Sequence, residues 1–220
     1  MIRASGSVIC STNLAGKREG VLMDTDKKFE MDESDVSIQG TVHWLQAHSG
    51  LMPEASPDTC FKRQPTGGKK PYTYDVSNPR RAKVDDEGLV IALSAGREPI
   101  TVTATEAGGQ SKSYRLFIPN GYPFFTFGPG RLGSLIQDAN RERVGLATLD
   151  DLRVLHQRFG HVWPLGGGQF WSTTGSAEKP EPPPPPPLET GINYYTKNMA
   201  NGGEQTNDSG HVFTALGRNL

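Results

Sequence analysis

Histidine and aspartate side chains are the first candidates for chemistry in this sequence. His156 and His161 lie five positions apart near the predicted end of a helix, where solvated or capping histidines are far commoner than metal ligands. Asp150 and Asp151 are adjacent, so their side chains diverge on a helix, and helix capping explains them better than paired acid–base catalysis. No serine lies in a Gly-x-Ser-x-Gly elbow of the kind that exposes a nucleophile. We therefore predict that the protein is not an enzyme.

Three oxygen-bearing side chains near the C-terminus, those of Glu204, Asn207 and Asp208, are the best candidates for a cation site. Their oxygens suit a hard cation such as calcium, but a polar loop that precedes a strand explains them at least as well. The glycines at 166–168 lack the Lys-Ser/Thr pair of a phosphate-binding loop and precede a predicted strand rather than a helix. We therefore expect no metal and no cofactor.

The two cysteines, Cys10 and Cys60, allow two interpretations. They form one disulfide in a protein exported from the cytoplasm, or they are two buried free thiols. A zinc site is not expected, because two cysteines so far apart, without paired histidines or further cysteines nearby, do not supply a tetrahedral set of ligands.

Composition limits the class of the protein and of its partners. The 220 residues suffice for one or two domains. A formal net charge of −1 with scattered basic residues predicts no nucleic-acid partner and no attraction to a membrane surface. No apolar run approaches the roughly 20 residues that span a bilayer. The N-terminus also lacks the apolar region of a signal peptide, so if the protein is secreted we expect this chain to be a fragment of a longer precursor.

Residues 72–118 carry the clearest structural pattern, which is a series of short strands separated by turns. The stretch 89–93 is a mostly apolar strand, and apolar and polar residues alternate over 100–104. Turn sequences occur at 85–88 and 108–110. Strands of this length and spacing predict an antiparallel β-sandwich.

An ordered set of residues within this stretch identifies the type of sandwich. The set consists of Tyr74, Ser77, Asn78, Pro79, Ala82, Val84, Asp85, Gly88, Val90, Leu93, Gly96, Ile100 to Ala104, Ser113 and Tyr114. In this order they resemble the second half of a bacterial Ig-like domain of group 2. The resemblance implies an Ig-like domain over residues 1–118, with 36–38 and 42–45 as its early strands and 1–30 as either its first strand or the end of a preceding module. Because such domains belong to exported proteins, the resemblance also favours a disulfide between Cys10 and Cys60.

After Pro119 the pattern changes from strands and turns to a mixture of strands and helices. An aromatic strand is predicted at 124–127. Apolar residues with helical spacing then form one face of a short helix, at Leu132, Leu135, Ile136 and Ala139. A second helix is predicted to begin at Thr148, which forms a capping box with Asp151, and to end at Gly160.

The order of these pieces also resembles a known domain. The relevant segments are Asp138–Asn140, Gly145–Thr148, Leu149–Leu152, Gly160, Trp163 and Gln169–Thr173. Their order is similar to that of a C-type-lectin-like domain, which implies an α+β domain over residues 119–220 that is closed by a strand at 210–216. The family's disulfide cysteines are missing from this half of the chain, and so are the calcium- and sugar-binding tripeptides of the lectins. The resemblance therefore implies the fold without calcium-dependent sugar binding.

Six consecutive prolines occupy positions 182–187, within a predicted proline-rich loop at 180–189. Such a run adopts an extended polyproline II helix and cannot join a sheet. It is either a stiff, exposed arm that contacts a receptor or an inserted loop without a partner. For the binding arm, with its neighbouring aromatic anchors, the predicted contact residues are Trp171, Pro182, Pro184, Pro186, Tyr194 and Tyr195.

An Ig-like domain followed by a terminal C-type-lectin-like domain resembles the tip of the intimin and invasin adhesins. The resemblance implies a mainly β protein, with an Ig-like β-sandwich followed by an α+β C-type-lectin-like domain. It further implies the distal fragment of an adhesin on the bacterial outer membrane, with a barrel anchor outside this fragment as its only link to the membrane. Its expected partner is a protein or glycan receptor on the surface of a host cell. The alternative is a structural surface stalk that acts in self-association or biofilm packing.

Overall fold

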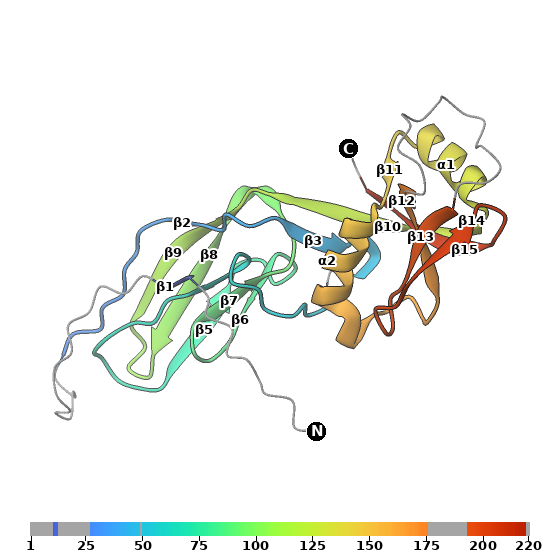
Figure 1. Ribbon diagram of the computed structural model, residues 1–220. Helices are drawn as coiled ribbons and strands as arrows, with labels where there is room; N and C mark the ends of the chain where they lie inside the picture. Colours follow the sequence, from blue (N-terminus) through green and yellow to red (C-terminus); the bar gives the residue numbers. More distant parts are fainter. Residues whose placement is uncertain (1–10, 13–26, 49, 176–192, 219–220) are drawn as a thin grey trace, which may run out of the picture. The chain divides into compact units, whose positions relative to one another are not determined.

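The computed structural model describes residues 11–12, 27–48, 50–175 and 193–218 (Figure 1). The chain divides into two compact units, of which the first comprises Met1–Val42 and Ala55–Gly121 and the second His43–Glu54 and Tyr122–Leu220. The predicted limits of two domains, 1–118 and 119–220, stay a prediction. The compact units depart from those limits mainly because residues 43–54 pack with the second unit.

The first unit contains two four-stranded sheets (Figure 1). One sheet has the order β2-β9-β8-β5, with β2 at Val36–Ser37, β9 at Ser111–Ile118, β8 at Gly96–Glu106 and β5 at Tyr72–Val76. The other has the order β1-β4-β7-β6, with β1 at Ser11–Thr12, β4 at Cys60–Lys62, β7 at Leu89–Ala92 and β6 at Ala82–Val84. The pairs β1/β4 and β2/β9 are parallel, and the other pairs are antiparallel. The predicted Ig-like β-sandwich is confirmed.

Turn chemistry and strand alternation explain why these residues form a sandwich. Asp85 opens the β6–β7 turn, where its Oδ1 accepts hydrogen bonds from the backbone N–H groups of Glu87 and Leu89 at 2.9 and 2.8 Å. Gly88 in this turn has a φ of 75°, a conformation that a residue with a Cβ rarely adopts. Along β8, the alternate residues Val102 and Ala104 are buried, each about 1 % exposed.

Arg63 is a buried cation that holds an irregular segment against the first unit. Its guanidinium lies 4.5 Å from the ring centroid of Tyr114 and 5.2 Å from that of Phe61. It donates hydrogen bonds of 2.8 Å to the carbonyl oxygens of Asp32 and Ser34, and it forms a 3.0 Å ion pair with the Asp32 carboxylate. The buried charge is therefore well compensated.

The second unit is built on one sheet with the order β14-β13-β12-β15-β10-β3, and β11 pairs with β15 beside this path. The strands are β3 (Val42–Leu45), β10 (Gly121–Gly130), β11 (Gly145–Leu146), β12 (Gln169–Gly175), β13 (Asn193–Asn198), β14 (Glu204–Asp208) and β15 (Phe213–Arg218). The helices are α1 (Leu132–Arg141) and α2 (Leu149–Phe159), and the 3₁₀ turns are η1 (Gln46–His48) and η2 (Gly160–Val162). Neither α-helix is long enough to cross a membrane, and no other helix in the described part of the chain is long and apolar enough to do so.

Strand alternation divides the core of this unit into two clusters. Phe170 and Leu216 belong to the cluster that α2 joins through Leu152, Leu155 and Phe159. The residues next to them in the sequence, Trp171 and Ala215, belong to the other cluster. Helix α1 contributes Leu132, Leu135 and Ala139 to that cluster. Because successive residues of a strand point to opposite faces, one helix covers each face of the sheet.

The first and last strands of the C-terminal segment pair with each other. β10 and β15 are antiparallel, with Phe125 opposite Gly217 and Thr126 opposite Leu216. Gly217 is required for close packing, since a Cβ at this position would lie 2.6 Å from an atom of the Phe125 ring. Closure by paired terminal strands, together with the two helices, agrees with the predicted C-type-lectin-like arrangement. The predicted fold class, mainly β with an Ig-like β-sandwich followed by an α+β domain, is confirmed.

One predicted strand lies in a different unit from the one that the sequence suggested. Residues 42–45 form a strand, as expected, but β3 pairs with β10 in the sheet of the second unit. Leu45 is 2 % exposed and lies in the α2-side cluster rather than in the core of the sandwich. The interpretation of 42–45 as an early strand of the Ig-like domain is therefore wrong.

Candidate functional site

The predicted binding residues lie on or between strands β12 and β13, which pair antiparallel. Trp171 lies opposite Thr196, and Gly175 lies opposite Tyr194. Pro182, Pro184 and Pro186 lie outside the described residues. Gly175 is the last described residue before this segment, and Asn193 is the first one after it.

Trp171 is a core residue rather than an exposed anchor. Its side chain is fully buried, and its ring packs edge-on against Phe213 with the centroids 5.0 Å apart. Its indole N–H donates a 3.1 Å hydrogen bond to the carbonyl oxygen of Gly130. The prediction that Trp171 contacts a receptor directly is therefore wrong, because the residue points to the sheet face that α1 covers.

Tyr194 and Tyr195 are not brought together, because they are successive residues of β13 and point to opposite faces of the sheet. Both are half-buried. Tyr194 packs against the α1-side cluster. The backbone carbonyl of Tyr195 accepts a 2.9 Å hydrogen bond from the Ser172 hydroxyl, which fixes β13 against β12.

An exposed apolar surface that sequence reasoning missed lies at residues 211–213, directly before and at the start of β15. Val212 is 57 % exposed, more than any other large hydrophobic residue in the described part of the chain. The ring of His211 stacks on that of Phe213 at 5.8 Å, and Phe213 in turn packs against the buried Trp171. We call His211, Val212 and Phe213 the 211–213 surface. The sequence signal was an apolar residue between two aromatic rings after Gly210, which predicted only a closing strand.

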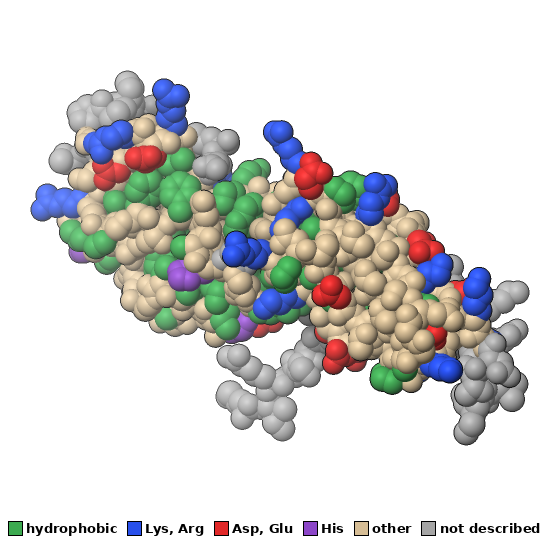
Figure 2. Space-filling view, turned by 180° about the vertical axis from the view of Figure 1, so that it is seen from behind, with side chains coloured by type: hydrophobic (Ala, Val, Ile, Leu, Met, Phe, Trp, Pro, Cys, Tyr) green, Lys and Arg blue, Asp and Glu red, His purple; other side chains and the backbone are tan. Residues whose placement is uncertain are grey.

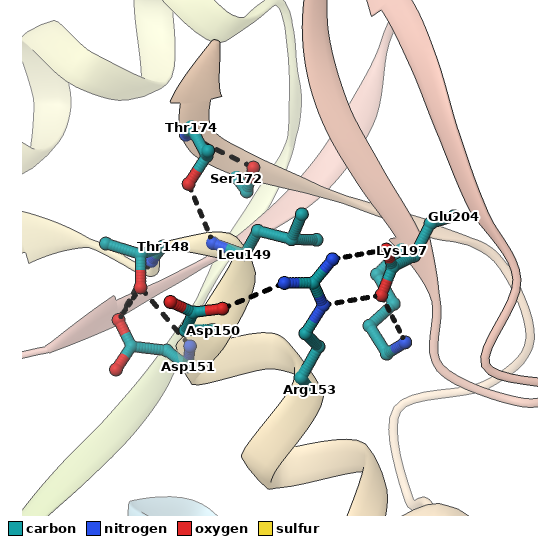
Figure 3. A network of polar contacts seen from close by, with 9 residues as sticks. All are labelled: Thr148, Leu149, Asp150, Asp151, Arg153, Ser172, Thr174, Lys197 and Glu204. Atoms are coloured by element: carbon teal, nitrogen blue, oxygen red, sulfur yellow. Dashed lines mark hydrogen bonds and ion pairs between the residues drawn. The ribbon is translucent and has the colours of Figure 1, made fainter. Parts of the chain in front are cut away.

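A polar network connects the start of α2 to the sheet (Figure 3). Arg153 donates two hydrogen bonds to the Glu204 carboxylate at 2.9 and 2.8 Å, and a third to Asp150 at 2.9 Å. Lys197, whose side chain is almost fully buried, donates to Glu204 at 3.0 Å and to the Gly202 carbonyl at 2.9 Å. Arg153 comes from α2, whereas Lys197 and Glu204 come from the neighbouring strands β13 and β14.

The contacts of this network shift the pKa values of Glu204 and Arg153. The hydrogen bond from Arg153 is the main cause that lowers the pKa of Glu204 to about 2; burial opposes it, and the hydrogen bond from Lys197 lowers the pKa further. The hydrogen bonds that Arg153 donates to Glu204 and then to Asp150 raise the pKa of Arg153. A carboxyl group with so low a pKa is ionised throughout the physiological range and does not donate protons as a general acid there. The contacts of this network therefore hold α2 against β13 and β14.

The candidate cation ligands near the C-terminus point to different partners. Glu204 is engaged by Arg153 and Lys197. The side-chain amide of Asn207 donates a 2.8 Å hydrogen bond to the Thr196 hydroxyl. Asp208 accepts a 2.8 Å hydrogen bond from the backbone N–H of Gly210. Within the described ranges, no cluster of three or more His, Cys, Asp and Glu side chains is arranged to hold a metal ion.

The N-terminus of α2 is held by the predicted capping box (Figure 3). The Thr148 hydroxyl accepts a 3.2 Å hydrogen bond from the Asp151 N–H, and the Asp151 carboxylate accepts from the Thr148 N–H at 2.8 Å. Asp151 also forms a 2.8 Å ion pair with Arg218 at the end of β15. The hydroxyl of Thr174 on β12 accepts a 3.0 Å bond from the Leu149 N–H. The prediction that Asp151 has a capping role is confirmed.

The two histidines flanking the end of α2 have different surroundings. Burial, and then the nearby charge of Lys197, lower the pKa of His156. His161 lies 3.4 Å from a carboxylate oxygen of Glu54 through its Nδ1. The two histidines therefore lie near different residues, Lys197 for His156 and Glu54 for His161.

Charges of both signs are interspersed on the face of the molecule that Figure 2 displays. No extended basic stripe is present on the displayed face. This distribution offers no electrostatic footprint for nucleic acid on that face.

Cys60 is 2 % exposed on β4, and Cys10 lies outside the described residues. No free cysteine occurs in the part of the chain that the structure describes. β1 pairs in parallel with β4, with Ser11 opposite Phe61, and the residues that precede this pair in the sequence are the two cysteines. The Cys10–Cys60 disulfide stays a prediction.

Comparison with known proteins connects this geometry to a family. Residues 58–107 match the family model of the intimin immunoglobulin-like domain. A mutant intimin from EHEC O157:H7 is 17% identical, with a TM-score of 0.47, over 86% of this chain and 97% of that one. A 282-residue C-terminal intimin fragment in complex with the intimin-binding domain of the translocated intimin receptor is 15% identical, with a TM-score of 0.44, over 84% of this chain and 65% of that one. Invasin, described as a bacterial integrin-binding protein, is 16% identical, with a TM-score of 0.38, over 89% of this chain and 38% of that one.

The search of curated proteins found no match to the chain. The family model covers all of β4 to β8, which includes strands and turns whose order predicts an Ig-like domain. The predicted resemblance to the intimin and invasin adhesins is confirmed at this domain, because residues 58–107 match the family model of the intimin immunoglobulin-like domain.

Proposed function

We propose that the chain is the distal, extracellular part of a bacterial surface adhesin and that its second unit binds a receptor on host cells. The observation that carries the proposal is an intimin-type Ig-like domain at 58–107, followed along the chain by an α+β unit with paired terminal strands. The same family match supports a location at the outer surface of the bacterium. The proposed receptor is a protein or a glycan on the host-cell surface.

Within the second unit, we propose that the 211–213 surface contacts the receptor. Val212 presents an exposed aliphatic side chain, while the ring of the next residue, Phe213, packs against the buried Trp171 and against the ring of His211. Interface hot spots are well-packed residues that are surrounded by contacts that exclude water. The proposed surface also includes the proline-rich arm, with Pro182, Pro184 and Pro186 as contact residues.

The charges in this unit support binding rather than catalysis. Glu204 is ionised and engaged by two cations, and Asp151 is engaged in helix capping and in an ion pair with Arg218. With a pKa of about 2, the Glu204 carboxylate is not poised near neutral pH for proton transfer. We therefore propose no catalytic role for the polar network.

Saturable binding of the labelled full chain to cultured epithelial cells tests the proposal. Binding that survives a calcium chelator and is lost after mild protease treatment of the cells would indicate a protein receptor. Loss after glycosidase treatment instead would indicate a glycan. Absence of saturable binding on every host-cell type tested would contradict the proposal.

The alternative function is self-association of a structural stalk, and the aromatic segment at 124–127 does not support it. The aromatic segment at 124–127 belongs to β10, which lies between β15 and β3 and is not a free edge. Phe124 within it is fully buried. Concentration-dependent association in analytical ultracentrifugation, in the absence of cell binding, would support the alternative.

A further inference from the structure

A strand from the N-terminal third of the chain completes the sheet of the second unit. β3 occupies the end of the sheet beside β10, and residues 43–54 belong to the second unit although residues 55–121 belong to the first. β10 thereby has a neighbour on each side, β15 and β3. Without the four-residue strand β3, the part of β10 that it pairs with would be a sheet edge with unpaired backbone groups.

Side chains of residues 43–54 also fill the core beneath α2. Leu45 is 2 % exposed within the α2-side cluster, and the half-buried Leu51 packs against the same cluster. The ring of His43 stacks on that of Phe124, with the centroids 5.8 Å apart. The contacts are therefore made by alternate residues of β3 and by the turn that follows it.

Backbone hydrogen bonding continues to the end of the segment. The N–H of Glu54 donates a 2.7 Å hydrogen bond to the carbonyl of Arg158, in the last turn of α2. The Glu54 carboxylate lies 3.4 Å from Nδ1 of His161. The segment thus contacts the second unit at β10, at the core cluster and at the C-terminal end of α2.

We infer that residues 43–54 act as a built-in strand, and that the surface formed by β10 and α2 is an acceptor site for an extended segment with this pattern. A segment that binds this site forms backbone hydrogen bonds with β10. It also places a leucine in the buried position of Leu45 and an aromatic ring against Phe124. Residues 122–220 alone then lack one edge of their sheet and part of their core, so they depend on the segment for a stable fold. This inference does not depend on the receptor.

Amide hydrogen exchange of the full chain with Leu45→Ala tests the dependence. We expect the exchange protection of α2 to fall by about thirtyfold or more. This factor corresponds to the smallest loss of stability that is usual when a buried leucine is replaced by alanine. The protection of β8 and β9 should not change. Gln46→Ala changes the exposed residue next to Leu45 and serves as the matched control. It should leave the exchange protection of α2 unchanged. Val102→Ala should lower protection in β8 and β9 and leave α2 unchanged. Unaltered protection of α2 in Leu45→Ala would overturn the inference.

A second experiment tests the acceptor site itself. In a full-chain variant whose residues 43–54 are replaced by Gly and Ser, α2 should lose its protection, and a synthetic peptide of residues 41–55 should restore it. The same peptide with Leu45→Asp should not restore it. Wild-type protection of α2 in this variant would overturn the dependence, and failure of the unaltered peptide to restore protection would overturn the acceptor site.

Discussion

At the scale of single residues, Glu204 links three elements of the second unit. Its carboxylate accepts hydrogen bonds from Arg153 on α2 and from Lys197 on β13, while Glu204 itself lies on β14. Bidentate contact with a guanidinium is among the strongest forms of charge-assisted hydrogen bonding. The carboxylate therefore contributes more than an isolated surface ion pair.

We expect Glu204→Gln to lower the free energy of unfolding by about 1–2 kcal/mol at neutral pH, because it removes the charge of a half-exposed but well-ordered network. The pKa of Glu204 in the folded protein, about 2, lies below its ordinary value of 4.5. The contribution is therefore complete above the ordinary pKa and is lost as the pH falls toward about 2. Urea unfolding measured across this range checks the expectation.

The control for this prediction is Glu87→Gln in the first unit. Glu87 pairs with Lys62, and its side chain is 73% exposed, so the expected loss is smaller. The stabilities of the wild type and of Glu204→Gln should converge in acid. A difference that stays constant from neutral pH to the acid limit would contradict the assignment of the effect to the charge of Glu204.

At the scale of elements, the start of α2 depends on its capping box. We expect Thr148→Ala to lower the free energy of unfolding by about 1 kcal/mol, because the hydrogen bond from the Asp151 N–H is lost. Thr148→Ser keeps a hydroxyl and should retain most of the stability. Urea unfolding followed by circular dichroism distinguishes the two variants, and equal losses in both would contradict the capping role.

Local sequence patterns predicted most elements of this fold. The alternation at 100–104, the apolar run at 89–93 and the turn glycines correspond to β7, β8 and their connections. The apolar spacing from Leu132 to Ala139 predicted α1, and the capping box predicted the start of α2. These features depend on interactions within a few residues, which is why one sequence suffices to identify them.

Strand pairing and side-chain burial that depend on residues far away in the sequence could not be predicted from local patterns. The pattern of residues 42–45 indicates a strand, but nothing in it indicates that β10 is its neighbour. Trp171 was interpreted as exposed because alternation does not show whether a helix covers a given face, and α1 covers this one. Val212 was assigned to a strand, although β15 begins one residue later and leaves its side chain exposed.

At the scale of the whole molecule, the predicted disulfide would tie the N-terminal region to the Ig-like unit. We expect reduction, or Cys60→Ser, to lower the free energy of unfolding of this unit by about 2–4 kcal/mol, because the cross-link restricts a long loop of the unfolded chain. Thiol alkylation of the denatured, non-reduced protein checks whether the bond is present. Two free thiols in protein from an oxidising compartment would contradict the prediction.

The two units divide the proposed work of the adhesin. The Ig-like unit contains the match to the intimin immunoglobulin-like domain, and the buried Arg63 in this unit is compensated by its hydrogen bonds and by its ion pair with Asp32. The second unit has the exposed 211–213 surface, and its polar network and capping box are engaged in holding the fold. We therefore propose that the second unit binds the receptor.

The measurement that tests this claim most directly is the affinity of full-length Val212→Asp for host cells, beside the matched variant Val162→Asp. Both valines are exposed, at 57 % and 37 %, so neither change should disturb the fold, which circular dichroism verifies. We expect Val212→Asp to weaken binding by about tenfold or more, as for the loss of a residue that contacts the receptor, while Val162→Asp binds like the wild type. Wild-type affinity of Val212→Asp, or equal weakening by both variants, would contradict the claim.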